Sequence, residues 1–418
     1  MGIGREELLG SLTRQRELLA ESIVLTPVDS LSFSLPDRAH TAFLHGLYLT
    51  DKVRDREASR EAVIQFGGRS AAAEDIAAIH RLLADAFGAA EGSLRLLAGL
   101  QAHAATFMSI SAAGQSVMLL PAEAGGHFST HAILQRLGLS TIDIPIDFEH
   151  LAVDREATLA LVDRVRPEFV FVDRSEGLRY EDFAFLGELN GPVKIFDASQ
   201  YVTQIITGRY ENPLAWGFDL MLFTLHKSFP GPQKAGIVSR ESGPLWELVV
   251  KGLSGLVSSS HAENTYLVGL ALLRADWLED YATRLLGTAS ALEGELMRQG
   301  VSVVPRARQG EADWPGTHHI WIAASDRDDA FAQYENLTAA GVHVNYRKLP
   351  YRLGYGLRLG TAFSATAGIG VGHVEELAEI LATAIREDVG TSLRGRVRDL
   401  ATDARQDAIL APAHWEAA

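Results

Sequence analysis

The stretch LFTLHKSFPGP at residues 222–232 decides how this chain folds and where its chemistry lies. Its apolar start predicts a buried β-strand, which ends in Thr-x-His-Lys before a loop with two prolines and a glycine. A second apolar run, residues 193–196, leads to Asp197. A strand-end lysine and a strand-end carboxylate suit pyridoxal phosphate (PLP), because the amine binds the aldehyde and the carboxylate keeps the ring nitrogen protonated. A lone strand-end lysine is usually a solvated surface charge, so this hypothesis depends on its neighbours.

The bulk composition is that of a globular enzyme. At 418 residues, two or more domains are expected. The net charge of −15, from 38 basic and 53 acidic residues, disfavours nucleic acid or an anionic membrane as a partner. The absence of cysteine excludes disulfides, thiolate metal sites and cysteine nucleophiles. The first residues lack a signal-peptide core and no apolar run is long enough to span a bilayer, so we expect a cytoplasmic protein.

Apolar runs that alternate with amphipathic segments predict an α/β fold. The expected strands are residues 116–121, 141–147, 169–173, 193–199, 220–226 and 235–240, and the expected helices are 74–88, 131–139 and 157–166. Such alternation implies a mainly parallel sheet with helices on both faces. Ligands of such sheets bind beyond the carboxyl ends of the strands, where Ser175, Asp197, His226 and Lys227 fall. We therefore expect these four residues to share one site.

The pattern changes near residue 280, which predicts a smaller α+β domain. Its expected elements are helices 282–300, 328–340 and 373–388 and strands 318–324, 342–347 and 356–362, and a helix over 5–21 starts the chain. The expected division is an N-terminal segment (1–55), a large PLP-binding domain (56–280) and a small C-terminal domain (281–418). His318 and His319 are not expected to bind a metal together, because neighbouring strand residues point to opposite faces.

Between about residues 20 and 390 the chain resembles the serine hydroxymethyltransferase branch of the fold-type I PLP enzymes. The most specific portion is DASQ at 197–200 followed by TLHKSFPGP at 224–232. The resemblance implies the aspartate aminotransferase-like fold. It also implies that Lys227 carries the Schiff base and later acts as a base, and that Asp197 holds the pyridinium proton.

Further segments match the same family in order. His127, in AGGH, looks like the histidine that stacks on the cofactor ring and can carry a proton. Arg358, in GLRLGT, looks like the arginine that binds the substrate carboxylate. Ser175 falls where the family places a serine near the cofactor's 3′-oxygen, and Tyr48 falls near its active-site tyrosine. By the same resemblance, His226 and Gln200 are expected beside the cofactor.

The phosphate-binding segment departs from the family. Where the family has Ser-Gly-Ser, this chain has Ala-Gly-Leu at 98–100, so only the backbone amides of Gly99 and Leu100 remain as donors at the start of a helix. Ser258–Ser260 lie where the family brings in a loop from the neighbouring subunit, and Ser259 is expected to replace the lost hydroxyls. This interpretation implies a homodimer with shared sites. The alternative is an ordinary serine-rich turn.

The substrate side departs as well. The family has a glutamate two residues after its tyrosine, where this chain has Thr50 followed by Asp51. A threonine cannot transfer protons as a carboxylate does at neutral pH. The family's early Ser-Glu-Asn reads Val-Asp-Ser at 28–30, its histidine three residues after the aspartate is Gln200, and Pro230 and Gln233 replace basic residues. Ordinary folate-dependent hydroxymethyl transfer is therefore not expected.

We predict a PLP enzyme, a transferase or lyase, that acts at Cα of a small-molecule amino acid. The preferred reaction is cleavage and formation of the Cα–Cβ bond of a β-hydroxy-α-amino acid, as in a threonine aldolase or transaldolase, in specialised biosynthesis. Two alternatives stay open at this point. One is an oxygen-using oxidative decarboxylase or deaminase on the same scaffold, and the other is a cofactor-binding regulator without catalysis.

Overall fold

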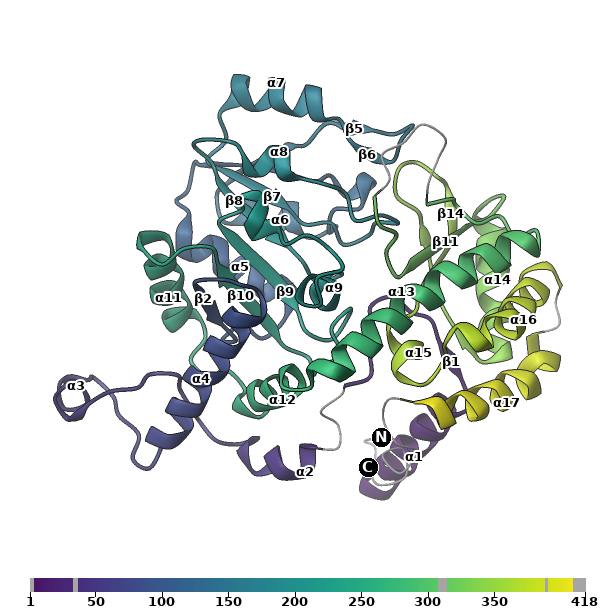
Figure 1. The fold of residues 1–418 in the computed structure, drawn as a ribbon, viewed down its shortest axis with the longest axis horizontal. Coiled ribbons are helices and arrows are strands. Elements are labelled where there is room, and N and C mark those ends of the chain that lie inside the picture. Colours follow the sequence, from purple (N-terminus) through teal and green to yellow (C-terminus); the bar gives the residue numbers. More distant parts are fainter. Residues whose placement is uncertain (1–3, 33–36, 307–313, 388–389, 409–418) are drawn as a thin grey trace. The chain divides into compact units, whose positions relative to one another are not determined.

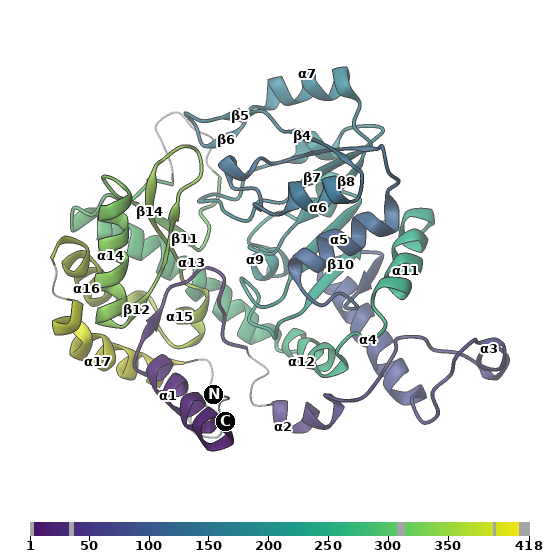
Figure 2. The same ribbon diagram turned by 180° about the vertical axis from the view of Figure 1, so that it is seen from behind.

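The computed structural model of the protein describes residues 4–32, 37–306, 314–387 and 390–408. The chain forms two compact units, shown in Figure 1 and from behind in Figure 2. The large unit is Ser34–Leu278, and the small unit combines Met1–Phe33 with Glu279–Ala418. The three-part division expected from the sequence, with limits at 55 and 280, stays a prediction. No helix among the described residues is long and apolar enough to cross a membrane.

A seven-stranded sheet forms the centre of the large unit. Its strand order is β2-β10-β9-β8-β7-β3-β4, and only β10 runs antiparallel to its neighbours. The predicted α/β fold with a mainly parallel sheet is confirmed. The bounds are β2 (Glu91–Ser93), β3 (Ser116–Leu119), β4 (Ser140–Asp143), β7 (Phe169–Val172), β8 (Val193–Asp197), β9 (Leu220–Thr224) and β10 (Ala235–Ser239).

Helices pack on both faces of this sheet. Figure 2 shows α5 (Gly99–Ile110) and α6 (Thr130–Arg136) on one face, and with α11 (Pro244–Leu256) they bury one apolar cluster with the sheet. On the other face, Phe87 at the end of α4 stacks on Phe223 of β9 with ring centroids 4.7 Å apart. The other elements of this unit are α2 (Arg38–Thr41), η2 (Ala42–Leu44), α3 (Arg56–Glu61), α4 (Ser70–Ala86), η3 (Ala122–Ala124), β5 (Ile146–Asp147), β6 (Ala152–Val153), α7 (Arg155–Val165), α8 (Ala184–Gly187), α9 (Val202–Ile206), α10 (Pro213–Trp216) and α12 (Ala262–Leu272).

The register of β8 and β9 brings the two key loops to one edge of the sheet. Asp197 lies opposite Leu222 in the parallel pairing, and every residue of β9 is buried. The strands end at Asp197 and Thr224, so the loops that follow them leave the same edge. The predicted strands over 193–199 and 220–226 are thus two residues too long at their ends, because the chain turns where the sheet's hydrogen bonding stops.

Two further predictions differ from the structure. The strand expected over 141–147 is two strands, β4 in the central sheet and β5 in a separate pair with β6. Pro145 lies between them and lacks the N–H that a continued strand needs. The start of helix α5 at Gly99 was expected from the family resemblance, but the apolar periodicity did not predict this helix. Its residues are apolar on most sides, so the pattern lacks the one-sided stripe of a surface helix.

The small unit is built around the antiparallel sheet β11-β14-β13 and a parallel pair of β1 with β12. The predicted small-unit helices and strands are present, but the strand expected over 342–347 is divided into β12 and β13. The helix expected over 373–388 is α16, which ends at Arg386. His318 precedes β11 rather than lying on it, and its ring is 4.4 Å from that of His319. No group of three potential metal ligands occurs in the part of the chain described. The elements are α1 (Arg5–Ala20), β1 (Ile23–Val24), α13 (Ala275–Arg298), which starts in the large unit, β11 (His319–Ala323), α14 (Arg327–Ala340), β12 (Val342–His343), β13 (Asn345–Lys348), β14 (Tyr355–Gly360), α15 (Ala362–Thr366), η4 (Val371–His373), α16 (Val374–Arg386), η5 (Gly390–Leu393), α17 (Arg394–Ala404) and η6 (Arg405–Asp407).

Candidate active site

Two serines join the loops that follow β8 and β9. The Ser199 hydroxyl accepts the N–H of Thr224 at 3.0 Å, and the Ser228 hydroxyl donates to the Ser199 carbonyl at 3.1 Å. The same Ser228 hydroxyl accepts the N–H of Val202 at 3.0 Å. These bonds fix the loop that carries Lys227 against the loop that carries Asp197, so both side chains start from rigid backbone.

The turn after Lys227 depends on Gly231. Its N–H donates to the Leu225 carbonyl at 2.9 Å, which closes the loop. A Cβ at this position would lie 2.6 Å from that carbonyl oxygen and 2.9 Å from the Phe229 ring. The loop closes this tightly only around a residue without a side chain.

Asp197 is a buried carboxylate that remains ionised. Its Oδ2 accepts from Nε2 of His103 at 2.6 Å, and its Oδ1 accepts from the N–H of Ser199 at 2.8 Å. Burial by itself would raise the pKa of Asp197. The hydrogen bond from His103 and the positive charges of His103 and Lys227 outweigh burial and lower this pKa to about 2.

The Asp197 and Lys227 pair fits PLP. A carboxylate that keeps its charge when buried can stabilise a protonated ring nitrogen. Lys227 is half-buried, and it is close enough to Asp197 for its charge to lower the pKa of Asp197. Two residues that contact one PLP molecule have to lie this near each other. His226, beside it, is half-buried too. The structure thus brings together the two residues on which the sequence-based hypothesis depends.

The glycines before His127 let two loops meet. The Gly125 carbonyl accepts the N–H groups of Ser175 and Glu176 at 2.8 and 3.1 Å. Gly125 has a φ of 89°, and a Cβ there would lie 2.2 Å from the Glu176 carbonyl oxygen. At Gly126 a Cβ would lie 2.3 Å from a backbone carbonyl oxygen. The AGGH segment is therefore needed to place His127 beside the loop of Ser175.

His127 and Gln200 have defined hydrogen bonds in this region. Nδ1 of His127 accepts the N–H of Ser129 at 3.2 Å, so the neutral ring carries its proton on Nε2. The ring centroid of His127 is 6.2 Å from that of His103. Gln200 is buried and donates from Nε2 to the Ser175 carbonyl at 3.2 Å. His127, Ser175 and Gln200 thus lie in the same region as Asp197.

Gly99 is the first residue of α5, and the preceding residue supplies no side-chain cap. The first N–H groups of this helix are donors that the helix itself does not use. A Cβ on Gly99 would lie 2.9 Å from the Thr224 methyl group, so a glycine lets α5 start against the end of β9. Leu100 is 38% exposed. The structure therefore has a helix N-terminus beside the strand that leads to Lys227. The free N–H groups of a helix N-terminus are suited to bind an anionic phosphate.

His103 was missed as a site residue by the sequence reasoning. It lies in the first turns of α5, is 2% exposed and bonds Asp197, which is 94 residues away in the chain. The signal that could have found it is a lone histidine in an otherwise apolar helix that starts at the phosphate-binding segment. A buried histidine in such a place needs polar partners.

The segment around Tyr48 lines a cavity of the large unit. Tyr48 is 40% exposed, packs on Phe66 with ring centroids 4.8 Å apart, and lines a cavity of about 200 Å³ with Thr50 and Ser258. No bond from Tyr48 to Lys227 or Asp197 occurs among the described residues. Its predicted place in the active site stays a prediction.

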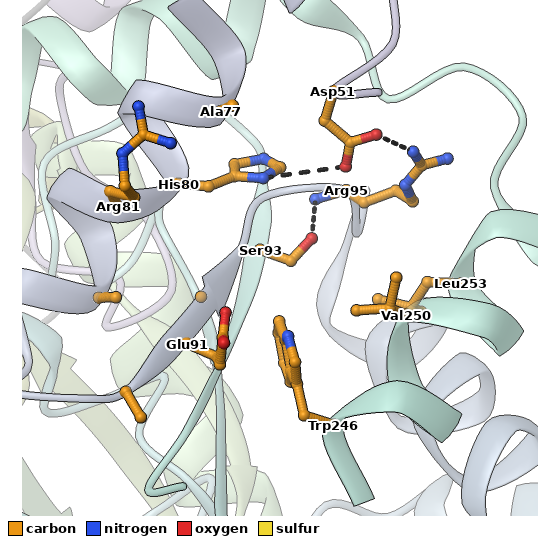
Figure 3. Close-up of a pocket in the computed structure, with 13 residues that line it drawn as sticks. Asp51, Ala77, His80, Arg81, Glu91, Ser93, Arg95, Trp246, Val250 and Leu253 are labelled. Atoms are coloured by element: carbon orange, nitrogen blue, oxygen red, sulfur yellow. Dashed lines mark hydrogen bonds and ion pairs between the residues drawn. The ribbon is translucent and has the colours of Figure 1, made fainter. Parts of the chain in front are cut away.

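Asp51, next to Thr50, is held by two cationic groups. Figure 3 shows its carboxylate between the Arg95 guanidinium, with which it forms an ion pair, and Nδ1 of His80 at 3.8 Å. Burial would raise the pKa of Asp51, but the charges of Arg95 and His80 lower it. These residues line a cavity of about 230 Å³ together with Trp246. Asp51 therefore has its partners within this unit and is ionised at neutral pH, with no proton to donate.

The serine-rich loop also has a structural anchor. Ser260 is buried, and its carbonyl accepts from Nζ of Lys234. Burial, and to a lesser degree the charge of Arg95, lowers the pKa of Lys234 to about 7. Ser258 is exposed and Ser259 half-buried. The prediction that Ser259 reaches a partner's phosphate site stays a prediction.

Arg358 belongs to the small unit. It lies in the middle strand β14, opposite Trp321 on one side and Asn345 on the other. The side chain is 7% exposed, and burial lowers the pKa of Arg358 to about 10. Burial makes the charged guanidinium less favourable, and a carboxylate bound to it by two parallel hydrogen bonds would offset this desolvation cost.

Known proteins resemble this chain over most of its length. The L-threonine:uridine-5'-aldehyde transaldolase of a Streptomyces species is 32% identical over 77% of this chain and 78% of its own. The chain belongs to the family of serine hydroxymethyltransferase-like PLP enzymes. Fluorothreonine transaldolase of Streptantibioticus cattleyicolor, another relative, is 31% identical over 75% of this chain, which spans only about half of that protein (49%). Serine hydroxymethyltransferase of Archaeoglobus fulgidus is 28% identical over 75% of this chain.

The fold agrees with this family. The solved structure of L-threonine transaldolase from Pseudomonas fluorescens covers 99% of this chain, and this chain covers 96% of it, with a TM-score of 0.84 at 21% identity. No protein-family model matches the chain. The predicted fold-type I scaffold, the PLP cofactor and the status as an enzyme are confirmed. The transaldolase and hydroxymethyltransferase relatives support reaction at the Cα–Cβ bond of a β-hydroxy amino acid, and they give no support to the oxygen-using alternative.

Proposed function

We propose that this family member is a threonine transaldolase. It breaks the Cα–Cβ bond of L-threonine, releases acetaldehyde, and joins the remaining two-carbon amino-acid unit to the carbonyl carbon of a second aldehyde. The product is a new β-hydroxy-α-amino acid, and the exchange needs no external oxidant or reductant. Two relatives that carry transaldolase names, at 31% and 32% identity, support this assignment over hydroxymethyl transfer.

The observation that carries the proposal is the contrast between two carboxylates. Asp197 is buried and ionised, and Lys227 is close enough to lower its pKa, which preserves the cofactor side of the family's site. Thr50 stands where the family has its acid–base glutamate, and the neighbouring Asp51 is paired with Arg95. A carboxylate with a lowered pKa in an ion pair is a poor proton carrier at neutral pH. The residues that hold the ring are kept, while the hydroxymethyl-transfer side is not.

Lys227 and Asp197 have the central roles in this proposal. Lys227 would hold the cofactor through its aldehyde. As a free amine it would take the proton of the threonine hydroxyl when Cα–Cβ breaks and return it to the new hydroxyl when the second aldehyde adds. Asp197 accepts a hydrogen bond from the ring nitrogen and holds its proton. When bound, PLP takes up the electrons of the broken Cα–Cβ bond into its ring.

The loops around this pair position the ring and the phosphate. His127, which has Nε2 as its donor nitrogen, would pack over the ring face. Ser175, whose carbonyl accepts from Gln200, would lie near the ring oxygen, and His226 would border the ring beside Lys227. The N–H groups of Gly99 and Leu100 would hold the phosphate, and Ser259 of the partner subunit would add a hydroxyl donor.

Arg358 and Tyr48 complete the substrate contacts in this proposal. The Arg358 guanidinium binds the threonine carboxylate through two parallel hydrogen bonds, which fixes the amino acid's orientation. Tyr48 orients the side-chain hydroxyl, the group that loses its proton when acetaldehyde leaves.

The test is aldehyde-dependent release of acetaldehyde from L-threonine. Purified enzyme with PLP is incubated with L-threonine and one of a panel of aromatic, aliphatic and sugar-derived aldehydes. Acetaldehyde is followed by a coupled alcohol dehydrogenase, and the new amino acid by mass spectrometry. Lys227→Ala should abolish both signals. Lys251→Ala, an exposed lysine on α11, serves as the matched control and should keep both.

Three results would overturn the assignment. These are hydroxymethyl transfer from serine that depends on tetrahydrofolate, oxygen uptake with peroxide formation and no acetaldehyde, and no turnover of threonine with any aldehyde. Acetaldehyde release that is independent of added aldehyde would reduce the assignment to a threonine aldolase.

We also infer that the enzyme is a homodimer that works in the cytoplasm, as expected from the sequence. The lack of hydroxyl donors in residues 98–100 supports a contribution by the Ser258–Ser260 loop of a second copy. Sedimentation of the holoenzyme at low concentration measures the oligomeric state. A monomer with full PLP affinity would contradict the shared site.

A further inference from the structure

Behind Asp197 lies a buried chain of polar side chains from four different elements. Nε2 of His103 on α5 is 2.6 Å from Oδ2 of Asp197, and Nδ1 of the same ring is 3.3 Å from the Thr130 hydroxyl on α6. The Thr130 side chain is close enough to the carboxyl group of Asp173, which directly follows β7, to lower the pKa of that group. His103, Thr130 and Asp173 are 2%, 0% and 1% exposed.

The hydrogen bonds have a fixed direction at the Asp197 end. Asp197 is ionised and can only accept hydrogen bonds. Nε2 of His103 therefore carries a proton and donates a hydrogen bond to Asp197. The ring edge of His103 meets Phe171, with centroids 5.0 Å apart at 89°, so apolar packing fixes the plane of the imidazole. His103 therefore presents one donor, in one orientation, to the carboxylate that faces the cofactor ring.

At the other end the direction can reverse, because the Thr130 hydroxyl has a single proton. If Asp173 is ionised, Thr130 donates to it and accepts from a protonated Nδ1. If Asp173 is protonated, it donates to Thr130, which then donates to an unprotonated Nδ1. Burial, and to a small extent the charge of Asp197, raises the pKa of Asp173 to about 7, so both states are accessible near neutral pH.

Charged side chains from α5, from the end of β8 and from the loop after β9 face this chain of residues. Asp173 is faced by His103 and Asp197, and Asp197 is faced by His103 and Lys227. The backbone N–H of His127 donates to Oδ2 of Asp173 at 3.3 Å. Asp173 thus touches both the chain behind the ring carboxylate and the loop that carries the ring-stacking histidine.

We propose that His103 is a positioning residue, which holds Asp197 ionised and aimed at the ring nitrogen of PLP, and that Thr130 and Asp173 balance its charge by sharing a proton with it. This four-residue chain sets how strongly the ring nitrogen is held in its protonated form. The inference rests on PLP binding and is independent of which amino acid the enzyme uses.

The test compares two side chains of equal length at position 103. His103→Gln keeps an N–H group that reaches Asp197 but cannot bond Thr130 in the same way, and His103→Met keeps the volume without a donor. PLP is titrated into each apoprotein, and the visible absorbance of the bound cofactor is recorded from pH 5 to pH 9. No substrate is added, so the outcome is separate from that of the proposed function.

We expect His103→Met to weaken PLP binding by roughly tenfold to a hundredfold, as loss of a charge-assisted hydrogen bond implies. It should also shift the pH dependence of the absorbance. His103→Gln should recover most of the affinity. The matched control is His131→Gln on α6, which breaks an exposed histidine–aspartate pair of 2.7 Å with Asp143 and should change neither readout. Equal affinity and equal pH profiles for the Gln and Met variants of His103 would overturn the positioning role.

Asp173→Asn tests the far end of the chain without touching His103. The shared proton predicts a change of the cofactor absorbance near neutral pH in the wild type that is absent from this variant. Thr130→Val, which cannot relay a proton, should behave like Asp173→Asn, and Thr130→Ser should behave like the wild type. A nitrogen-15 NMR spectrum of the apoprotein reports the tautomer of His103 directly. Profiles of Asp173→Asn and Thr130→Val that superimpose on the wild type would contradict the proton-sharing part.

Discussion

Asp173→Asn should make the apoprotein more stable at pH 8 and not at pH 5. Burial raises the pKa of Asp173 from its ordinary value of 3.8 to about 7, against the lowering effect of His103 and Thr130. The folded protein therefore binds this proton more tightly than the unfolded chain does. Stability that is present below about pH 4 is lost as the pH rises to about 7. At about 1.4 kcal/mol for each pKa unit, the loss approaches roughly 4 kcal/mol.

The asparagine cannot ionise, so the variant avoids this loss. It gives up the attraction between the carboxylate and His103, and it adds an N–H group that needs an acceptor, which costs about 1–3 kcal/mol. The net expectation is a gain in the free energy of unfolding of about 1–3 kcal/mol at pH 8, and a small loss at pH 5. The sign of the effect therefore changes with pH.

The assay is urea unfolding of the apoprotein between pH 5 and pH 8.5, followed by the fluorescence of Trp216 and Trp246 in the large unit. Asp197→Asn is the matched opposite. The pKa of Asp197 is lowered to about 2, so its stabilisation is present above pH 3.8 and is lost as the pH falls towards 2. The amide should lose roughly 2.5 kcal/mol at pH 8. Asp143→Asn, an exposed carboxylate, should leave the curves almost unchanged.

The reasoning is refuted if Asp173→Asn destabilises the protein equally at pH 5 and pH 8. That result would mean that the buried carboxyl group keeps its ordinary pKa. Equal effects of Asp173→Asn and Asp197→Asn at pH 8 would also contradict it, since the two groups are expected to have opposite signs.

Three further variants, and a control for one of them, test the site. Arg358→Lys should raise the KM for L-threonine by roughly tenfold to a hundredfold, because a lysine cannot make two parallel hydrogen bonds to the carboxylate; steady-state kinetics with an unchanged KM would argue against its role. Gly231→Ala should destabilise the holoenzyme by about 1–3 kcal/mol, because the new Cβ would meet the Leu225 carbonyl oxygen at 2.6 Å. The control is Gly255→Ala, in open space on α11, which should be neutral or stabilising. Thermal melts of the two holoenzyme variants measure both effects. Lys227→Ala should lower turnover about a thousandfold or more while the protein stays folded, and retained activity would remove this lysine from the mechanism.

Residues within one strand and its following loop were predictable. The apolar runs before Asp197 and Lys227 specify buried parallel strands, and parallel strands end at one edge of a sheet. The two glycines before His127 are a sequence signal for close backbone approach, which the contact with Glu176 explains. The strand over 141–147 was predicted wrongly because apolar alternation does not show which sheet a strand joins, and Pro145 divides it between two.

Residues that act through a partner far along the chain were not predictable. The sequence shows only that Asp51 follows Thr50, and packing alone brings Arg95 and His80 against it. The same holds for His103, whose position in an apolar helix gives no sign of which carboxylate it meets. A side chain's partner depends on which faces of two elements pack together, and periodicity does not contain that information.

By itself, the sequence determined an α/β scaffold, a strand-end lysine and a strand-end carboxylate suited to PLP, since each rests on residues that are local in the chain. The tertiary structure decided the state of that carboxylate. Asp197 stays ionised although buried because α5 brings His103 to 2.6 Å and the next strand brings Lys227 close. Burial opposes charge and a nearby donor restores it, so the balance between them exists only once the helix packs on the sheet.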